Sequence, residues 1–131
     1  MNLNASARWL ALGAGALDLS SGLGLVLLPA FTLRLMGVAV PGSEALVFVR
    51  FVGVFVASVG ACYLWAVLAP GIRMRVVLGG TLFFRAGVFV FTGLCVLAGA
   101  LDAGWLAVTA ADAGLIIAQA WLLAKGVGAD A

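Results

Sequence analysis

The sequence predicts an all-α integral membrane protein, a four-transmembrane-helix bundle whose helices run up-down-up-down. Three observations predict this class. Of the 131 residues, 66% are hydrophobic and 9% are charged, whereas soluble domains are roughly half apolar and a quarter charged. Four stretches reach the length of about 20 apolar residues that a helix needs to cross a bilayer. Tryptophans lie near the ends of these stretches, as in the aromatic belts of membrane proteins. We expect one domain over residues 1–131.

The predicted helices cover, in chain order, residues 8–29, 44–69, 75–98 and 104–124. All prolines fall at or between the helix ends, where proline is tolerated: Pro29, Pro41 and Pro70. Ser43 and Glu44 are suited to cap the second helix, and Asp102 stands just before the fourth. Residues 31–41 are predicted to form an apolar loop at the outer interface. The first stretch exceeds a signal-peptide core in length and contains Asp18, so we expect it to be retained.

Each tryptophan lies within about a turn or so of a predicted helix end, and we interpret the four as interface anchors: Trp9, Trp65, Trp105 and Trp121. With four spans, both termini share one side with the loop between the second and third helices. That side carries four basic residues: Arg8, Arg73, Arg75 and Lys125. The other side carries Arg34 beside Glu44 and Asp102. The positive-inside rule therefore places both termini in the cytoplasm and the protein in the inner membrane.

Each predicted helix carries one ionisable residue inside its apolar stretch: Asp18, Arg50, Arg85 and Asp112. A charge at the bilayer centre costs roughly 2.5–3.5 kcal/mol, so these side chains are expected to face inward and find partners. At a rise of about 1.5 Å per residue, Asp18 and Arg85 share one depth, whereas Arg50 and Asp112 share another. The sequence therefore predicts two ion pairs, Asp18 with Arg85 and Arg50 with Asp112.

Small and polar residues one or two turns from these charges predict a polar seam on the inward face of each helix. The supporting residues are Ser21, Ser58, Thr81, Thr92, Thr109 and Gln119. Gly13, Gly15, Gly22 and Gly24 are expected to allow another helix to approach the first one closely. Cys62 and Cys95 fall in different leaflets, too far apart for a disulfide, and are interpreted as small apolar fillers.

The residue types exclude several classes of function. The chain contains no His, which removes the usual haem ligand and the commonest zinc ligand. No catalytic motif and no phosphate-binding glycine loop occurs, and the scattered basic residues predict no nucleic-acid partner. We therefore predict no catalytic residue, no metal and no cofactor, while a bound lipid or quinone is compatible with the sequence.

Several short motifs carry a resemblance to a known group. They are the Leu-Leu-Pro29 exit from the first helix, Leu35-Met36-Gly37 after it, Arg50-Phe-Val-Gly53, and Asp112 late in the chain. Over most of its length the sequence resembles small bacterial four-helix membrane proteins of the DoxX-like group. This resemblance implies a small membrane subunit or accessory protein, since some members are associated with redox complexes.

These observations favour a small accessory or structural subunit of a larger membrane assembly, working as a homo-oligomer or beside larger membrane partners. The Asp and Arg pairs would then fix the bundle. An alternative is a small oligomeric transporter or channel that uses the same charges along a path. A second alternative is a quinone- or lipid-handling membrane enzyme. The sequence leaves open whether the charges are structural or functional.

Overall fold

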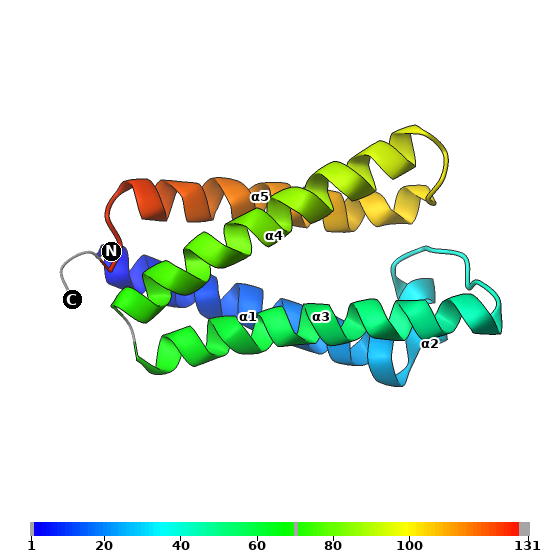
Figure 1. The fold of residues 1–131 in the computed structure, drawn as a ribbon, viewed down its shortest axis with the longest axis horizontal. Helices are drawn as coiled ribbons and strands as arrows, with labels where there is room; N and C mark the ends of the chain where they lie inside the picture. The colour runs from blue at the N-terminus through cyan, green and yellow to red at the C-terminus, as the bar shows by residue number, and fades with distance from the viewer. Residues whose placement is uncertain (1, 70, 129–131) are drawn as a thin grey trace.

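The computed structural model describes residues 2–69 and 71–128, which form helices and no strands. The elements are α1 (Leu3–Leu27), α2 (Pro29–Leu35), α3 (Ser43–Leu68), α4 (Ile72–Leu97), the short 3-10 helix η1 (Ala103–Trp105) and α5 (Leu106–Ala124) (Figure 1). Within the described residues, four helices are long and apolar enough to cross a membrane: α1, α3, α4 and the continuous η1–α5 segment. The predicted all-helical class with four spans is confirmed.

The largest differences from the predicted boundaries lie around α1. This helix begins at Leu3, five residues earlier than predicted, because the Asn2 side chain caps it by accepting a hydrogen bond of 2.8 Å from the Ala5 N–H. It ends at Leu27. Pro29 begins the separate helix α2, at the first helical position, where a backbone N–H would have no partner within the helix and proline is therefore tolerated. The segment predicted to be a loop over 31–41 is therefore partly helical.

The caps predicted for the second and fourth spans differ from those observed. Gly42 is the N-cap of α3, without a side-chain hydrogen bond, and Glu44 lies in the first turn. Asp102 likewise makes no capping bond. Its Oδ2 instead accepts a hydrogen bond of 2.8 Å from the Ala39 N–H, which joins the loop before η1 to the segment after α2. Asp102 thus connects two distant loops.

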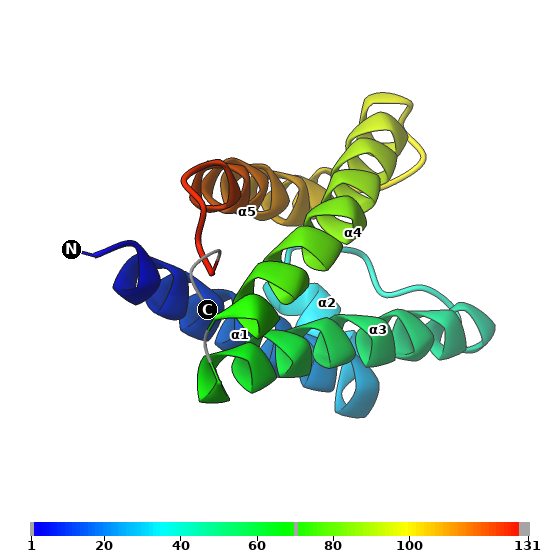
Figure 2. The ribbon, with the colours of Figure 1, turned by 60° about the vertical axis from the view of Figure 1, so that its left-hand side comes forward.

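The four long helices pack as two pairs. The first pair is α1 with α3, and the second pair is α4 with α5; contacts between the pairs are far fewer. Figures 1 and 2 show that α4 starts beside the end of α3 and then diverges from it toward its own C-terminal end. The start of α1 lies near the end of α5, where Leu3 and Val127 share one apolar cluster. The two pairs therefore meet over only part of their length.

Glycines set the spacing within the first pair. A Cβ built on Gly22 would lie 2.7 Å from the carbonyl oxygen of Gly53, and one built on Gly60 would lie 2.8 Å from that of Gly15. We call these four residues the glycine seam. They confirm the close approach predicted for Gly15 and Gly22. Gly13, for which the same was predicted, has no neighbour within 4 Å, and this part of the prediction is wrong.

Another of the predicted close-approach positions contacts a different element. A Cβ built on Gly24 would lie 2.8 Å from the Thr32 hydroxyl oxygen, on the neighbouring helix α2. Gly24 therefore accommodates the turn from α1 into α2, whereas the glycine seam accommodates α3.

The distribution of charged and large apolar side chains differs from that in a soluble protein. The buried polar or charged residues are Asp18, Thr81, Arg85, Thr92, Asp112 and Gln119. Large apolar side chains point outward instead; Phe48 is 71% exposed, Phe83 80% and Leu97 85%. Lys, Arg, Asp and Glu are almost never buried in soluble proteins, and large apolar patches are rarely exposed. This surface suits a lipid environment, and the chain is a multi-pass membrane protein.

The tryptophans lie close to helix ends, as the sequence predicts. Trp9, Trp65 and Trp121 are exposed; Trp65 and Trp121 lie within one turn of the end of their helices, and Trp9 lies within two turns of the start of α1. Trp105 ends η1 and packs partly against an apolar cluster that includes Leu33. Their positions fit an aromatic belt, and their role as interface anchors stays a prediction.

Candidate functional site

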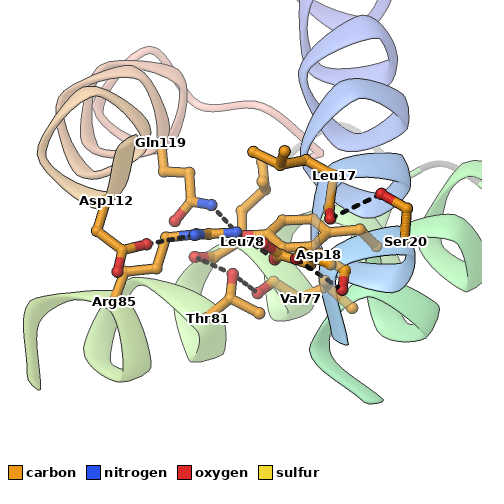
Figure 3. A network of polar contacts seen from close by, with 11 residues as sticks. Leu17, Asp18, Ser20, Val77, Leu78, Thr81, Arg85, Asp112 and Gln119 are labelled. Atoms are coloured by element: carbon orange, nitrogen blue, oxygen red, sulfur yellow. Dashed lines mark hydrogen bonds and ion pairs between the residues drawn. The ribbon is translucent and has the colours of Figure 1, made fainter. Parts of the chain in front are cut away.

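Arg85, in the middle of α4, is the centre of a buried cluster of polar side chains. Its Nη2 lies 2.5 Å from Oδ2 of Asp18 on α1, and its Nη1 lies 2.5 Å from Oδ1 of Asp112 on α5 (Figure 3). Its Nε donates a hydrogen bond of 2.9 Å to the hydroxyl of Tyr63 on α3. The guanidinium group therefore uses all three of its nitrogens, and each one binds a side chain from a different helix.

Gln119 completes the cluster from α5. Its Nε2 donates to the same Tyr63 hydroxyl, and both of these side chains are fully buried. Its Oε1 is buried and has no hydrogen-bond partner among the described residues. We call Asp18, Tyr63, Arg85, Asp112 and Gln119 the polar cluster. All four long helices contribute to it, and it lies where the two helix pairs meet.

Helical spacing brings these side chains to the same interface. On α1, Asp18 follows Ala11 and Ala14 on the buried face, and the small alanines let neighbouring helices approach the carboxylate. On α5, Asp112 and Gln119 are seven residues apart, which sets both on one face over two turns. Helices α1 and α5 thus present these polar residues along the face that they bury.

The electrostatics of the polar cluster favour a rigid arrangement. Arg85 is 3% exposed, Asp112 5% and Asp18 8%, so solvent screens these charges little. The guanidinium carbon also lies 5.3 Å from the centre of the Tyr63 ring, within range of a cation–π contact. Removing the shared cation from such a buried cluster costs about 3–5 kcal/mol, because an uncompensated charge is left behind.

The structure contains one of the two predicted ion pairs. Asp18 binds Arg85, as predicted, but the predicted pair of Arg50 and Asp112 is wrong, because Asp112 binds Arg85 as well. Arg50 is exposed, and its Nη1 donates to the carbonyl oxygen of Val26 at the end of α1. Arg50 therefore satisfies a free carbonyl at a helix C-terminus, where a positive charge also interacts favourably with the helix dipole.

Two geometric facts explain this correction. Arg50 and Tyr63 are thirteen residues apart on α3, which at about 100° per residue sets them about 140° apart around the helix. Since Tyr63 faces the cluster, Arg50 does not. Asp112 lies about 12 Å from the outer side of a core about 30 Å thick. It is thus only about 3 Å from the depth of Arg85, within reach of an arginine side chain.

The predicted polar seam is present on three of the four long helices. Thr81 and Thr92 of α4 are buried, and the Thr92 hydroxyl lies 2.8 Å from that of Thr109 on α5. Ser21 of α1 is partly buried and donates a 3.3 Å bond to the carbonyl of Asp18. Ser58 of α3 is exposed, and its hydroxyl donates a hydrogen bond of 2.8 Å to the Val54 carbonyl oxygen on the same helix. Its predicted place on the inward face is wrong.

Tyr63 is the member of the cluster that sequence reasoning missed. It is the only tyrosine in the chain, and it lies ten residues after Gly53 and three after Gly60. All three lie on the same face of the helix. Following that face one turn beyond Gly60 would therefore have identified Tyr63 as an inward-facing residue. A lone phenol in an apolar span is itself a signal, since a buried hydroxyl needs a partner.

Neither cysteine is a member of the polar cluster. Cys62 is exposed and Cys95 partly exposed, and both are free thiols. Cys62 therefore fills no interior space, contrary to the prediction. Over residues 2–69 and 71–128, no group of three or more His, Cys, Asp or Glu residues is placed to hold a metal ion.

The fold and the cluster together define a multi-pass membrane protein whose helices meet around a buried arginine. Comparison of the chain with protein-family models, curated proteins and solved structures found no match. The resemblance to DoxX-like proteins therefore stays a prediction.

Proposed function

We propose that the protein is a small accessory or structural subunit of a larger membrane assembly, in which the polar cluster holds the two helix pairs in one arrangement. The observation that carries this proposal is the bonding of Arg85. Each of its three nitrogens is used by a side chain of another long helix. A guanidinium bound to three other helices in this way holds the bundle together.

The proposal includes an up-down-up-down topology with both termini in the cytoplasm and the chain in the inner membrane. The basic residues at one end support this orientation. Arg73 stacks on Trp65, with its guanidinium carbon 4.2 Å from the ring centre. Arg75 donates a 3.4 Å bond to the carbonyl of Val127. Both arginines thus lie where the end of α3, the start of α4 and the C-terminal segment come together.

The apolar surface supports a role beside other membrane-embedded chains. Phe48, Phe51 and Phe55 of α3 are each more than half exposed, as is Phe91 of α4. Aromatic side chains provide much of the contact area in protein interfaces. Lipid, another copy of the chain or a larger partner would cover them, and the DoxX-like resemblance implies a partner of the last kind.

Native mass spectrometry of the protein released from its own membrane in mild detergent tests the proposal. We expect a complex of fixed stoichiometry, either with other subunits or with further copies of the chain. A matched sample of the Arg85→Gln variant should show less complex, because the two helix pairs lose their brace. A protein that stays monomeric under all mild conditions, without a partner, would contradict the proposal.

A second candidate function, a small oligomeric transporter or channel, is favoured by one observation. The polar cluster holds two carboxylates against one guanidinium, and intramembrane charges that are not balanced commonly mark ion or proton pathways. Purified protein in liposomes would then carry a flux that Asp112→Asn abolishes and the exposed variant Ser58→Ala leaves intact. An accessory subunit would show no flux in either form.

A further inference from the structure

The polar cluster has an unbalanced formal charge. Asp18 and Asp112 face Arg85 from two other helices, and Tyr63 and Gln119 are the remaining polar groups that face it. Among the described residues, Arg85 is the only cation in ion-pair contact with either carboxylate. The predicted fourth charge, Arg50, points elsewhere. With both carboxylates ionised, the cluster would carry one net negative charge.

Several hydrogen-bond acceptors of the cluster also have no partner among the described residues. Each carboxylate uses one oxygen on Arg85, and the second oxygen of each makes no hydrogen bond to a described residue. The buried Oε1 of Gln119 likewise has no partner among those residues. Figure 3 shows the Gln119 amide directed from α5 toward Arg85 and Asp112. The unused acceptors thus converge on the same small region as the surplus negative charge.

Both features call for the same missing component. A net charge in the interior of a bilayer protein costs several kcal/mol unless it is compensated. A single proton removes that charge, and the carboxylic acid that it forms has an O–H that can donate to one of the unused acceptors. A proton needs no cavity of its own, whereas a metal cation needs a shell of several oxygen ligands.

We propose that the polar cluster is a proton-binding site, which holds one exchangeable proton on the carboxyl groups of Asp18 and Asp112. The proton adds to one carboxylate oxygen to form a neutral carboxylic acid, while the other carboxylate balances Arg85. This inference does not depend on the accessory role proposed above, because a structural cluster and a transport site would both need the proton.

Infrared difference spectroscopy of the purified protein in lipid at neutral pH tests the proposal. We expect wild type to show the C=O stretch of one protonated carboxyl group. The band should be absent from both Asp18→Asn and Asp112→Asn, because one carboxylate then remains to balance Arg85 and needs no proton. Absence of the band from wild type, or its persistence in both variants, would overturn the proposal.

A stability measurement gives a second readout. Each single Asn variant mimics the protonated cluster, so we expect it to unfold at nearly the wild-type denaturant concentration. The double variant leaves Arg85 without a counter-charge and should unfold far more readily. At alkaline pH the proton leaves, so wild type should lose stability relative to either single variant, because folding then buries a net charge. Equal pH dependence in wild type and the single variants would contradict the proposal.

Discussion

The interface inside the first helix pair and the interface between the two pairs are built on opposite principles. Inside the pair, the glycine seam brings α1 and α3 together through backbone contacts, with a glycine facing a glycine at two levels. Between the pairs, few residues touch, and the polar cluster supplies the specific contacts. Helices in lipid gain little from hydrophobic burial, so they associate by close packing or by hydrogen bonds. This protein uses one solution at each interface.

The comparison predicts different sensitivities. The first interface depends on the absence of side chains, so it should respond to volume and ignore charge. The second depends on matched donors and acceptors, so it should respond to charge and hydrogen bonding. Three substitutions test this difference, and a fourth measures a hydrogen bond inside the second pair. All four are compared by free energies of unfolding from detergent titration in mixed micelles.

The largest effect is expected from Arg85→Gln. The substitution leaves two carboxyl groups facing each other without their shared cation and deprives Tyr63 of a donor. We expect a loss of about 3–5 kcal/mol in the free energy of unfolding, the cost of breaking a buried ion pair. The exposed Arg34 provides a control, since Arg34→Gln should change stability little. If the two variants proved equally stable, the polar cluster would not hold the pairs together.

A smaller loss is expected from Gly22→Ala. The new methyl group would meet backbone atoms of α3, with the Gly53 carbonyl oxygen at 2.7 Å, so the two helices must separate. Overpacking of this kind costs about 1–3 kcal/mol. Gly13→Ala on the same helix is the matched control, because its Cβ meets nothing within 4 Å. Equal stability of these two variants would show that the glycine seam does not determine the spacing.

Tyr63→Phe should have a slightly smaller effect. It keeps the ring but removes the acceptor shared by Arg85 Nε and Gln119 Nε2. Hydrogen bonds between membrane helices contribute about 1–2 kcal/mol in model peptides. We expect a loss in that range in the same titration, together with increased hydrogen exchange of the Gln119 amide by NMR. A gain in stability would mean that the hydroxyl is not part of the brace.

The smallest effect is expected from Thr92→Val, which removes the 2.8 Å hydroxyl contact with Thr109 within the second pair. The average contribution measured for such interhelical bonds is about 0.6 kcal/mol. The valine keeps the shape of threonine, so packing is nearly unchanged. A double-mutant cycle with Thr109→Val should return a coupling energy of this size, and a coupling of zero would show that the two hydroxyls do not interact.

The spans and several members of the cluster were predictable from the sequence. Apolar length alone located four helices, because a bilayer sets a minimum span. Asp18, Arg85, Asp112 and Gln119 stood out because polar residues are costly in apolar stretches. Depth arithmetic paired Asp18 with Arg85 correctly. It failed for Arg50 and Asp112, since a difference of a few ångströms in depth is within the length of one arginine side chain.

Capping preferences also failed to predict the contacts made between the predicted spans. Ser43 and Asp102 occupy positions that commonly cap helices, yet neither side chain forms a capping bond. Asp102 binds the Ala39 N–H instead, and that partner lies 63 residues away in the chain. A contact over such a distance depends on how α2 and η1 are placed relative to one another, which spacing along the sequence does not encode.

The sequence by itself determined that this chain has four stretches long and apolar enough to cross a membrane and that its buried charges must find partners. Both conclusions follow from the cost of transferring polar groups into hydrocarbon, which depends on residue type and little on arrangement. Tertiary structure alone decided which partners meet. Rotation about the axis of α3 turns Arg50 away and brings Tyr63 inward, so that Arg85 binds both carboxylates. The cluster thus holds two carboxyl groups against one guanidinium, because the direction of a side chain depends on how the helices pack.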